Sequence, residues 1–211
     1  MEQKTLKYLR IFIPGMIILL GSYPIFQFHL GEAFDIKGLN VTYVSFLSIL
    51  LGGVYYQLNI QRLITKPSHF LITKNILDKL ILAYGKSVDK EQRKNLKYKD
   101  AYMTTFYSVI DNDESLKRKG ENVRFNGIFW TSTADSAVIS VFFYYIYKNL
   151  TDIPQYVVLQ QVFFFAALIS LALHIISVIK HINLSNKQLN PIINDKKLSG
   201  VLKTKFDEIL Y

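Results

Sequence analysis

The most prominent pattern along the chain is a set of four long apolar stretches separated by polar segments. They cover residues 11–30, 39–60, 128–147 and 156–179. Each is close to the ~20 residues that an α-helix needs to cross a hydrocarbon core ~30 Å thick. The pattern therefore predicts an all-α, polytopic membrane protein with four transmembrane helices.

Basic residues are distributed unevenly among the polar segments. The two short connectors carry only Lys37 and Lys148, whereas 23 of the 25 Lys and Arg lie in the N-terminal tail, the long middle segment and the C-terminal tail. An even number of crossings places these three segments on one side, and the positive-inside rule makes that side cytoplasmic. The composition, rich in Lys, Ile and Asn, is typical of AT-rich bacteria. We expect a multi-pass inner-membrane protein with both termini in the cytoplasm.

The polar segments divide the chain into four parts. Residues 1–60 hold the first two predicted spans, residues 61–127 form a helical cytoplasmic module, residues 128–180 hold the last two spans, and residues 181–211 form a cytoplasmic tail. The module has fourteen Lys and Arg against eight Asp and Glu, so its net charge is +6. A lone module of this size is marginally stable, so we expect it to depend on packing against its neighbours.

Three helices are expected in the module, at residues 68–84, 90–110 and 114–125. Gly85 fits the end of the first helix, and Asp89 fits the N-cap of the second. We therefore expect residues 61–127 to form a small helical module.

The C-terminal tail is predicted to contain a loop at Asn190 and Pro191, followed by an amphipathic helix. Such a helix either docks on a protein or lies on the bilayer surface. Because only a few basic residues flank it, we favour docking on the module. Its apolar face comprises Leu198, Val201, Leu202, Phe206, Ile209 and Leu210.

The first two spans contain features that affect helix packing. Pro14 and Pro24 each remove one backbone hydrogen bond from the first span, and the freed carbonyls need partners in neighbouring helices. Ordinary tolerance of proline and a hinge for gating both remain open. In the second span, Ser48 and Gly52 form a small-xxx-small step, which allows another helix backbone to approach closely. We favour packing within the chain over a contact between subunits.

Residue content excludes several kinds of site. The absence of Cys excludes disulfides, thiolate metal sites and Cys nucleophiles. The four His residues have no zinc-motif spacing, no Ser lies in a nucleophile-elbow context, and no Gly-rich phosphate loop occurs. We therefore expect no catalytic residue, no bound metal and no cofactor, and we interpret the protein as a non-enzyme.

Asp135 is unusual because it lies about two turns inside the third predicted span. A carboxylate at that depth costs about 2.5–3.5 kcal/mol on insertion scales, so it must face protein or water. Hydroxyl residues continue a polar stripe beside it. The stripe either lines a water-filled path or forms a hydrogen-bonded patch between helices. The candidate pore or gating residues are Thr131, Ser132, Asp135, Ser136, Ser140 and His174.

His174 lies on the fourth predicted span at nearly the same depth as Asp135. A pair between the two side chains is therefore geometrically allowed. Because His titrates near neutral pH, such a pair could relay a proton or bias a channel. A buried structural pair is the alternative.

The module also mixes basic residues with aromatic rings. Tyr98, Tyr102 and Phe106 recur every four residues on one face of the predicted helix 90–110. Basic residues that contact phosphates, beside rings that stack on bases, are typical of single-strand binding. The alternative is that the rings form the core and the charges a solvated surface. The candidate ligand-binding residues are Arg93, Lys94, Lys97, Tyr98, Tyr102, Phe106, Lys117, Arg118, Lys119 and Arg124.

The chain resembles small four-span effectors of bacterial antiphage defence, and the Hailong-type membrane channel in particular. The resemblance rests on architecture, basic charge and aromatic content over the whole chain. It implies a homo-oligomeric channel or pore-forming effector that changes inner-membrane permeability. It also implies control by a cyclic nucleotide or single-stranded oligonucleotide, made by a nucleotidyltransferase encoded nearby. The positions that carry it are Arg93, Lys94, Tyr98, Tyr102 and Lys117–Lys119 on the ligand side, with Thr131 and Asp135 on the pore side.

Two other hypotheses remain open. One is a non-enzymatic membrane scaffold that docks a soluble partner on its basic face. The other is a small proton-coupled membrane protein that uses Asp135 and His174. A carrier with inverted repeats is disfavoured, because Pro and Gly interrupt only the first pair of spans. In the channel hypothesis several copies must assemble in the lipid bilayer, since four spans do not easily enclose a pore.

Overall fold

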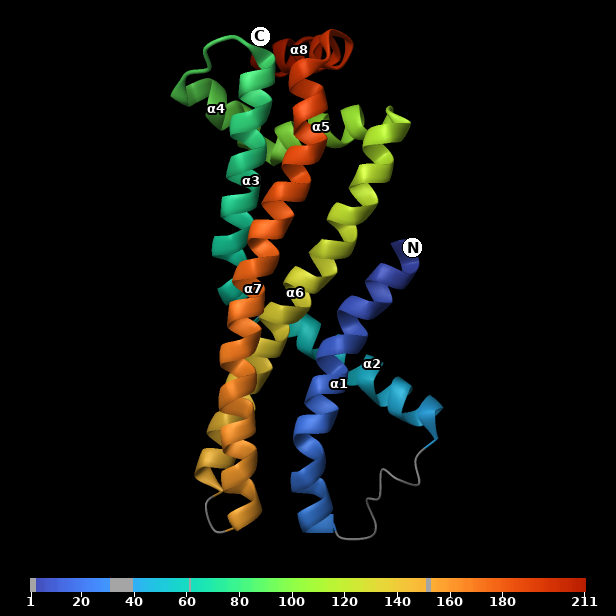
Figure 1. Ribbon diagram of the computed structural model, residues 1–211, viewed down its shortest axis with the longest axis vertical. Helices are drawn as coiled ribbons and strands as arrows, with labels where there is room; N and C mark the ends of the chain where they lie inside the picture. The colour runs from blue at the N-terminus through green and yellow to red at the C-terminus, as the bar shows by residue number, and fades with distance from the viewer. Residues whose placement is uncertain (1–2, 31–39, 61, 151–152) are drawn as a thin grey trace. The chain divides into compact units, whose positions relative to one another are not determined.

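The computed structural model describes residues 3–30, 40–60, 62–150 and 153–211 (Figure 1). These residues form helices and no strand, which confirms the predicted all-α class. The connector residue Lys37 and the predicted segment limits at Leu39 and Gln61 lie outside the described residues. The helices are α1 (Gln3–Leu30), α2 (Val41–Leu58), α3 (Arg62–Tyr84), α4 (Lys90–Lys97), the 3₁₀ turn η3 (Tyr98–Asp100), α5 (Ala101–Asp111), α6 (Glu114–Asn149), α7 (Pro154–Asn194) and α8 (Lys196–Leu210).

Among the described residues, three helices are long and apolar enough to cross a membrane. They are the segment Thr5–Phe28 of α1, the whole of α2, and α7. This finding supports the prediction of a membrane protein. The remaining predicted span, residues 128–147, lies within α6, which falls outside this group. Its Ser and Thr residues around Asp135 make that stretch less apolar than the other three.

The chain divides into two compact units. The first, called the apolar unit here, comprises Met1–Lys66 and Gly127–Ser177. The second, the basic unit, comprises Pro67–Asn126 and Val178–Tyr211, with eighteen Lys and Arg against eleven Asp and Glu. Both α6 and α7 contribute residues to each unit.

The core of the apolar unit is aromatic. Stacked rings of α6 and α7 lie at its centre, with 5.1 Å between the centroids of Phe143 and Phe163 and 5.6 Å between those of Tyr147 and Phe163. Such pairs contribute about 0.5–1.5 kcal/mol beyond the area they bury. Ile17 and Ile18 of α1 pack against the same cluster. The buried members are Tyr55, Ile139, Phe143, Tyr147 and Tyr156.

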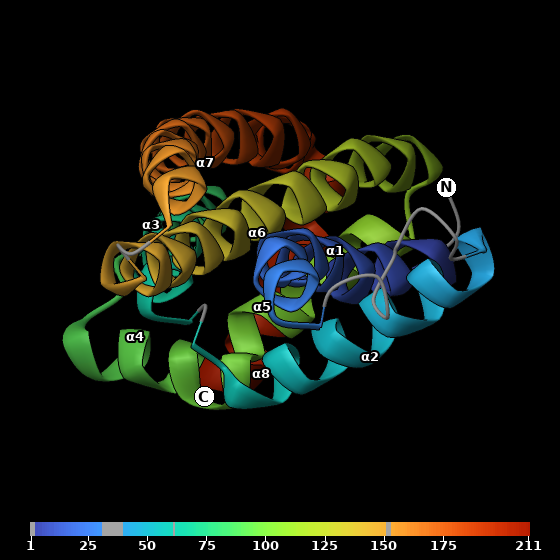
Figure 2. The ribbon, with the colours of Figure 1, turned by 90° about the horizontal axis from the view of Figure 1, so that it is seen from below.

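The backbones of α1 and α2 touch where the two helices cross (Figure 2). A Cβ atom added to Gly15 would lie 1.7 Å from the Ser48 carbonyl oxygen, and one added to Gly52 would lie 1.8 Å from the Ile11 carbonyl oxygen. Only glycine allows so close an approach, in which Cα–H groups face carbonyl oxygens. The small-xxx-small step therefore packs against α1 within the chain, as predicted.

Helix α1 continues through both of its prolines. Near Pro24, the Tyr147 hydroxyl donates to the Gly21 carbonyl at 2.6 Å, and the Tyr156 hydroxyl donates to the Pro24 carbonyl at 3.4 Å. Neighbouring helices thus supply hydrogen-bond partners to backbone carbonyls around this proline, as expected for a helix that lipid cannot solvate.

Helices α6 and α7 run antiparallel within the apolar unit. Tyr147 contacts Tyr156 at one end of the pair, with 5.3 Å between ring centroids. Trp130 stacks on His174 at the other end, with 6.4 Å between centroids. The pairing extends over 17 residue steps of α6, which correspond to about 25 Å at ~1.5 Å per residue.

The basic unit is a helical domain with its own core. Helix α8 packs on α3, α4 and α5 within this unit, as predicted for the tail: Phe206 is fully buried, and its ring centroid lies 5.5 Å from that of Tyr84 of α3. Next to them, Lys86 Nζ donates to Asp207 at 2.8 Å. The largest fully buried side chains of the unit are Leu77, Leu80, Tyr84, Leu96, Ile110, Leu116, Leu189, Ile192, Leu202 and Phe206.

The predicted helix 90–110 is wrong, because the chain turns at η3. Lys99 and Asp100 have φ values of 49° and 56°, in the left-handed region, which ends one helix and starts the next. The turn allows Leu96 of α4 and Tyr102 of α5 both to be buried. The helix ends on either side of this segment agree with the sequence: Gly85 has φ 73°, and Asp89 forms a capping box with Gln92.

The predicted loop at Asn190 and Pro191 is also wrong, because α7 continues to Asn194. Leu189 and Ile192, on either side of the proline, are fully buried. Their burial outweighs the cost of a proline inside a helix, ~3 kcal/mol. Helix α3 likewise begins at Arg62 rather than residue 68, and it includes Pro67.

Candidate functional site

Asp135 lies in the interior of the apolar unit, where it is only 5% exposed. Tyr55 of α2 is also buried, and its hydroxyl donates to Asp135 Oδ1 at 3.3 Å. A buried carboxylate is expensive unless it has a hydrogen-bond donor or a nearby cation. Helices α6 and α2 thus contribute to one polar site inside an otherwise apolar unit.

The hydroxyl groups near Asp135 have different partners. Ser136 Oγ lies 2.9 Å from Ser170 Oγ of α7. Thr131 Oγ1 donates to carbonyls of its own helix. Ser140 is buried, and the buried Ser132 Oγ has no hydrogen-bond partner among the described residues. The predicted polar stripe is therefore buried or half-buried in this unit and is only partly used for contacts between helices.

His174 contacts α6 at Trp130 rather than at Asp135. Its Nδ1 atom lies 3.1 Å from the Trp130 carbonyl oxygen, and its ring stacks on the Trp130 ring. Asp135 instead bonds Tyr55. The Asp135–His174 pair considered from the sequence is therefore replaced by two separate contacts. The reason is the register of α6 and α7, which places Trp130 beside His174 and leaves Asp135 facing α2.

The site around Asp135 has limited chemical options. A carboxylate surrounded by hydroxyl groups can attract a cation, carry a proton or hold helices together. Among the described residues, no group of three or more His, Cys, Asp and Glu is placed to hold a metal ion. The arrangement is therefore suited to an electrostatic or a structural role inside a membrane.

The aromatic residues of the basic unit are not a continuous stacking surface. Tyr98, in η3, is 67% exposed, whereas Tyr102 is 5% and Phe106 is 3% exposed. Burial also raises the pKa of the Tyr102 hydroxyl. Because the helix breaks before Tyr102, the expected four-residue spacing does not bring the three rings onto one face. Tyr102 and Phe106 are core residues and are not available to stack on a base.

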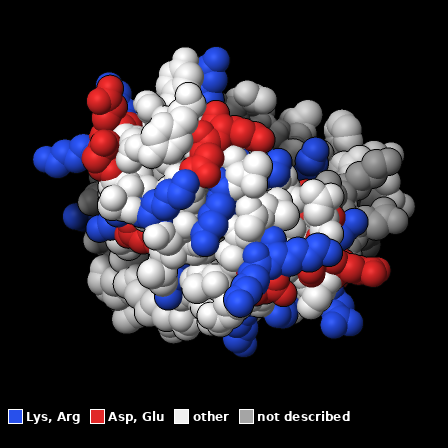
Figure 3. Space-filling view, turned by 90° about the horizontal axis from the view of Figure 1, so that it is seen from above, with Lys and Arg blue, Asp and Glu red and all other residues white. Residues whose placement is uncertain are grey.

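The predicted basic residues fall into two groups. Two arginines make ion pairs: Arg93 lies 3.0 Å from Asp78, and Arg124 lies 3.7 Å from Asp111. The others lie on the surface without an ion pair among the described residues; these are Lys94, Lys97, Lys117, Arg118 and the partly exposed Lys119. On the face in Figure 3, Asp and Glu side chains lie among the Lys and Arg side chains. The net positive charge is therefore not gathered into one uniform patch there.

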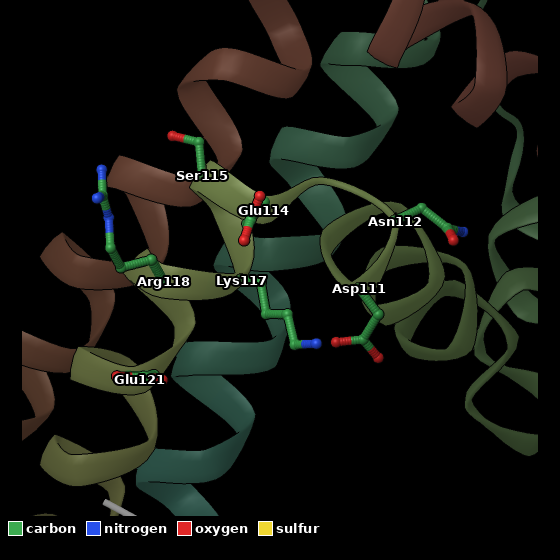
Figure 4. A pocket seen from close by; sticks show the side chains of 7 residues that line it. All are labelled: Asp111, Asn112, Glu114, Ser115, Lys117, Arg118 and Glu121. Carbon is green, nitrogen blue, oxygen red and sulfur yellow. The ribbon is translucent and has the colours of Figure 1, made fainter.

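A surface cavity of about 740 Å³ lies near the start of α6 (Figure 4). Lys117 points toward Asp111 on one side, while Arg118 points away from it. Three carboxylates against two cations make this cavity a poor site for an anion. The residues that line it are Asp111, Asn112, Glu114, Ser115, Lys117, Arg118 and Glu121.

The contact between Tyr55 and Asp135 was not predicted from the sequence. The two residues are 80 positions apart, and helical periodicity carries no information on which helices pack together. From the sequence alone, Tyr55 is an aromatic residue near the end of an apolar stretch, a position typical of the membrane surface. Comparison of the chain with protein families, curated proteins and solved structures gives no match. Function is therefore inferred from the residues themselves.

Proposed function

We propose that the chain is a subunit of a homo-oligomeric inner-membrane channel or pore-forming effector. In this proposal α6 provides a fourth membrane crossing, and its polar face borders the path for ions. The observation that carries the proposal is the burial of Asp135 inside an apolar unit, with Tyr55 as its hydrogen-bond donor. Ionisable residues inside membranes usually serve ion or proton pathways.

The pairing of α6 with α7 supports the fourth crossing. The two helices are in contact from Tyr147 and Tyr156 to Trp130 and His174, over most of a ~30 Å hydrocarbon core. If α7 crosses the membrane, its antiparallel neighbour lies at the same depth along this length. The polar side chains Asp135 and Ser136 then point away from lipid, while Phe142 and Tyr145 are exposed as lipid-facing residues are. An even number of crossings follows, with the basic unit and both termini in the cytoplasm.

The hydroxyl groups beside Asp135 support a path for ions. Ser132 Oγ is buried without a protein partner among the described residues. Buried hydroxyl groups of this kind are normally satisfied by water. A hydrated interior next to a carboxylate favours cations over anions.

The basic unit is proposed to bind the anionic molecule that controls the channel. Its net charge is +7. Lys99 Nζ lies 5.3 Å from the centroid of the exposed Tyr98 ring. Lys94 and Lys97 are exposed on the adjacent helix α4. A ring and several cations suit a nucleotide or an oligonucleotide. The resemblance to antiphage effectors leads to the same ligand class and to a nucleotidyltransferase as its source.

A membrane scaffold is the second candidate function. It is favoured by the contact between Ser136 and Ser170, which uses part of the polar stripe for packing. The burial of Tyr102 and Phe106 favours it as well, because these rings serve the core of the basic unit. In this case Asp135 and Tyr55 would only join α6 to α2.

Ion flux in liposomes separates the two functions. The purified chain is reconstituted and cation flux is measured with and without a panel of cyclic nucleotides and single-stranded oligonucleotides. Asp135→Asn removes the charge with little change of shape, and we expect cation flux to fall about tenfold, equivalent to ~1.4 kcal/mol in the barrier. The control is Thr133→Val, because Thr133 Oγ1 bonds only backbone carbonyls of its own helix. Wild-type liposomes that stay impermeable under every condition would favour the scaffold.

A further inference from the structure

An apolar groove opens on the apolar unit between α1, α2 and α6. Its volume is about 320 Å³, and its lining exposes no polar surface. Tyr55 and Ile139 are buried and form its floor. Val54, Leu58 and Phe142 form its rim and are largely exposed. The groove is therefore open to whatever surrounds these helices.

We expect the rim to face the interior of a bilayer. Both α1 and α2 are long and apolar enough to cross a membrane. An acyl chain is flexible, narrow and wholly apolar, so it matches a groove that offers no hydrogen-bonding group. A bound acyl chain exchanges dispersion contacts with bulk lipid for similar contacts with the groove, so these contacts do not select one lipid over another. Selection among lipids must come from the headgroup.

Two basic residues follow the last lining residue of α2 and its C-terminal end along the chain. The groove includes Ile60, and the Arg62 amide donates to the Asn59 carbonyl at 3.1 Å. Lys66 follows one helical turn later, and both basic side chains are exposed. Residues 40–66 contain no Asp or Glu, so no acidic residue in this part of the sequence neutralises them. The segment that follows Ile60 is therefore suited to an anionic group.

We infer that the groove binds an anionic phospholipid, with one acyl chain between the rim residues and the phosphate at Arg62 and Lys66. A phospholipid supplies an apolar chain and a negative charge in one molecule, and so matches both the groove and the basic segment that follows Ile60. The site is distinct from the proposed ion path. It is nevertheless adjacent to it, because the Tyr55 ring forms the floor of the groove while its hydroxyl bonds Asp135. A bound acyl chain therefore restrains Tyr55 in the position that contacts the carboxylate.

The test is native mass spectrometry of the full chain in detergent with added phosphatidylglycerol or phosphatidylcholine. We expect wild-type protein to retain phosphatidylglycerol at least fivefold better than phosphatidylcholine. Arg62→Gln should reduce that preference about fivefold, since one basic residue at a membrane surface contributes ~1 kcal/mol. Lys197→Gln, which removes an exposed charge on α8, should leave it unchanged.

Groove-filling variants test the acyl chain. Val54→Trp and Leu58→Trp place a large ring at the rim, and each should abolish retention of both lipids. Val162→Trp is the matched control, because Val162 is an exposed residue of α7 away from the groove. Equal retention of the two lipids by wild-type protein would overturn the inference, as would unchanged retention by both groove variants. A dimer mass that disappears in both variants would instead identify the occupant as a second copy of the chain.

Discussion

The hydroxyl of Tyr147 on α6 donates a 2.6 Å hydrogen bond to the carbonyl oxygen of Gly21 on α1. The bond joins residues 126 positions apart and lies one helical turn before Pro24. In lipid, water is not available to satisfy a backbone carbonyl disturbed by a proline. The contact therefore stabilises both the path of α1 and its packing on α6.

Tyr147→Phe should lower the stability of the protein in detergent by about 0.5–1.5 kcal/mol, since it removes one buried hydrogen bond and little volume. Thermal unfolding followed by tryptophan fluorescence measures this change, because Trp130 lies in the same unit. Tyr145→Phe is the control, since Tyr145 is two residues away and largely exposed. Equal behaviour of the two variants would show that the bond to Gly21 contributes nothing.

Two adjacent glycines of α2 should respond in opposite ways to alanine. A Cβ atom at Gly52 would meet the Ile11 backbone, whereas one at Gly53 would have no atom within 4 Å. We expect Gly52→Ala to destabilise the protein by about 1–3 kcal/mol, as overpacking does. Gly53→Ala should be neutral or stabilise by up to ~1 kcal/mol through helix propensity. Unfolding midpoints in one detergent compare the two, and an equal loss in both would contradict the close crossing of α1 and α2.

The stability of the basic unit should fall at acidic pH. Hydrogen bonds from Lys86 and Tyr84 hold the pKa of the Asp207 carboxyl below its usual value of about 4. A lowered carboxyl pKa stabilises the fold above the unfolded-state pKa, and this contribution is lost as pH falls through the folded-state value. The Asp207 carboxylate raises the pKa of Lys86, so the same contact is also lost above about pH 10.5 as that amine deprotonates.

Thermal unfolding of wild type and Asp207→Asn at several pH values checks this prediction. The difference in midpoint should be largest between about pH 5 and pH 9 and should shrink on either side. High salt should reduce it, because Lys86 and Asp207 are both substantially exposed. A difference that is constant from pH 3 to pH 11 would show that the carboxylate has no such role.

Docking of α8 should depend on Phe206. This side chain is fully buried against Tyr84, so Phe206→Ala should cost about 3–5 kcal/mol. Val201→Ala, on the exposed side of the same helix, should cost less than about 1 kcal/mol. Amide hydrogen exchange over residues 196–210 should become faster in the first variant only. Unchanged protection in Phe206→Ala would mean that α8 is held by other contacts.

Local chemistry made several features predictable from the sequence. Gly85 ends α3 because it adopts a left-handed conformation, and Asp89 starts α4 because its carboxylate caps the helix. The apolar face of α8 indicated a docked helix, and the small residues Ser48 and Gly52 indicated a close helix crossing. Each of these predictions depends on residues within a few positions of one another.

Features that depend on distant residues were not predictable in this way. Pro191 usually ends a helix, but here the burial of Leu189 and Ile192 keeps α7 continuous. Neither glycine nor proline marks the turn at Lys99 and Asp100, so periodicity alone favoured one long helix. Tyr102, which we expected on the ligand-binding surface, therefore lies in the core.

In the candidate site, too, the local feature was predictable and the contact between distant residues was not. The depth of Asp135 in the third apolar stretch was sufficient to identify it as an unusual residue. The hydrogen-bond partner of Asp135 depends on which helices pack together. In the structure the donor is Tyr55 of α2 and not His174 of α7. One polar residue could be found from the sequence, but the electrostatic environment that determines its role could not.

The central claim is that α6 crosses the membrane, which gives four crossings and places the basic unit in the cytoplasm. Because the chain contains no Cys, single cysteines report their location without background labelling. A membrane-impermeant maleimide is added to intact cells and to lysed cells that express one of three variants: Lys148→Cys, Lys90→Cys or Lys197→Cys. We predict that only Lys148→Cys is labelled in intact cells and that all three are labelled after lysis. If α6 does not cross, Lys197→Cys will be labelled in intact cells and Lys148→Cys will be protected, which would contradict the four-crossing topology.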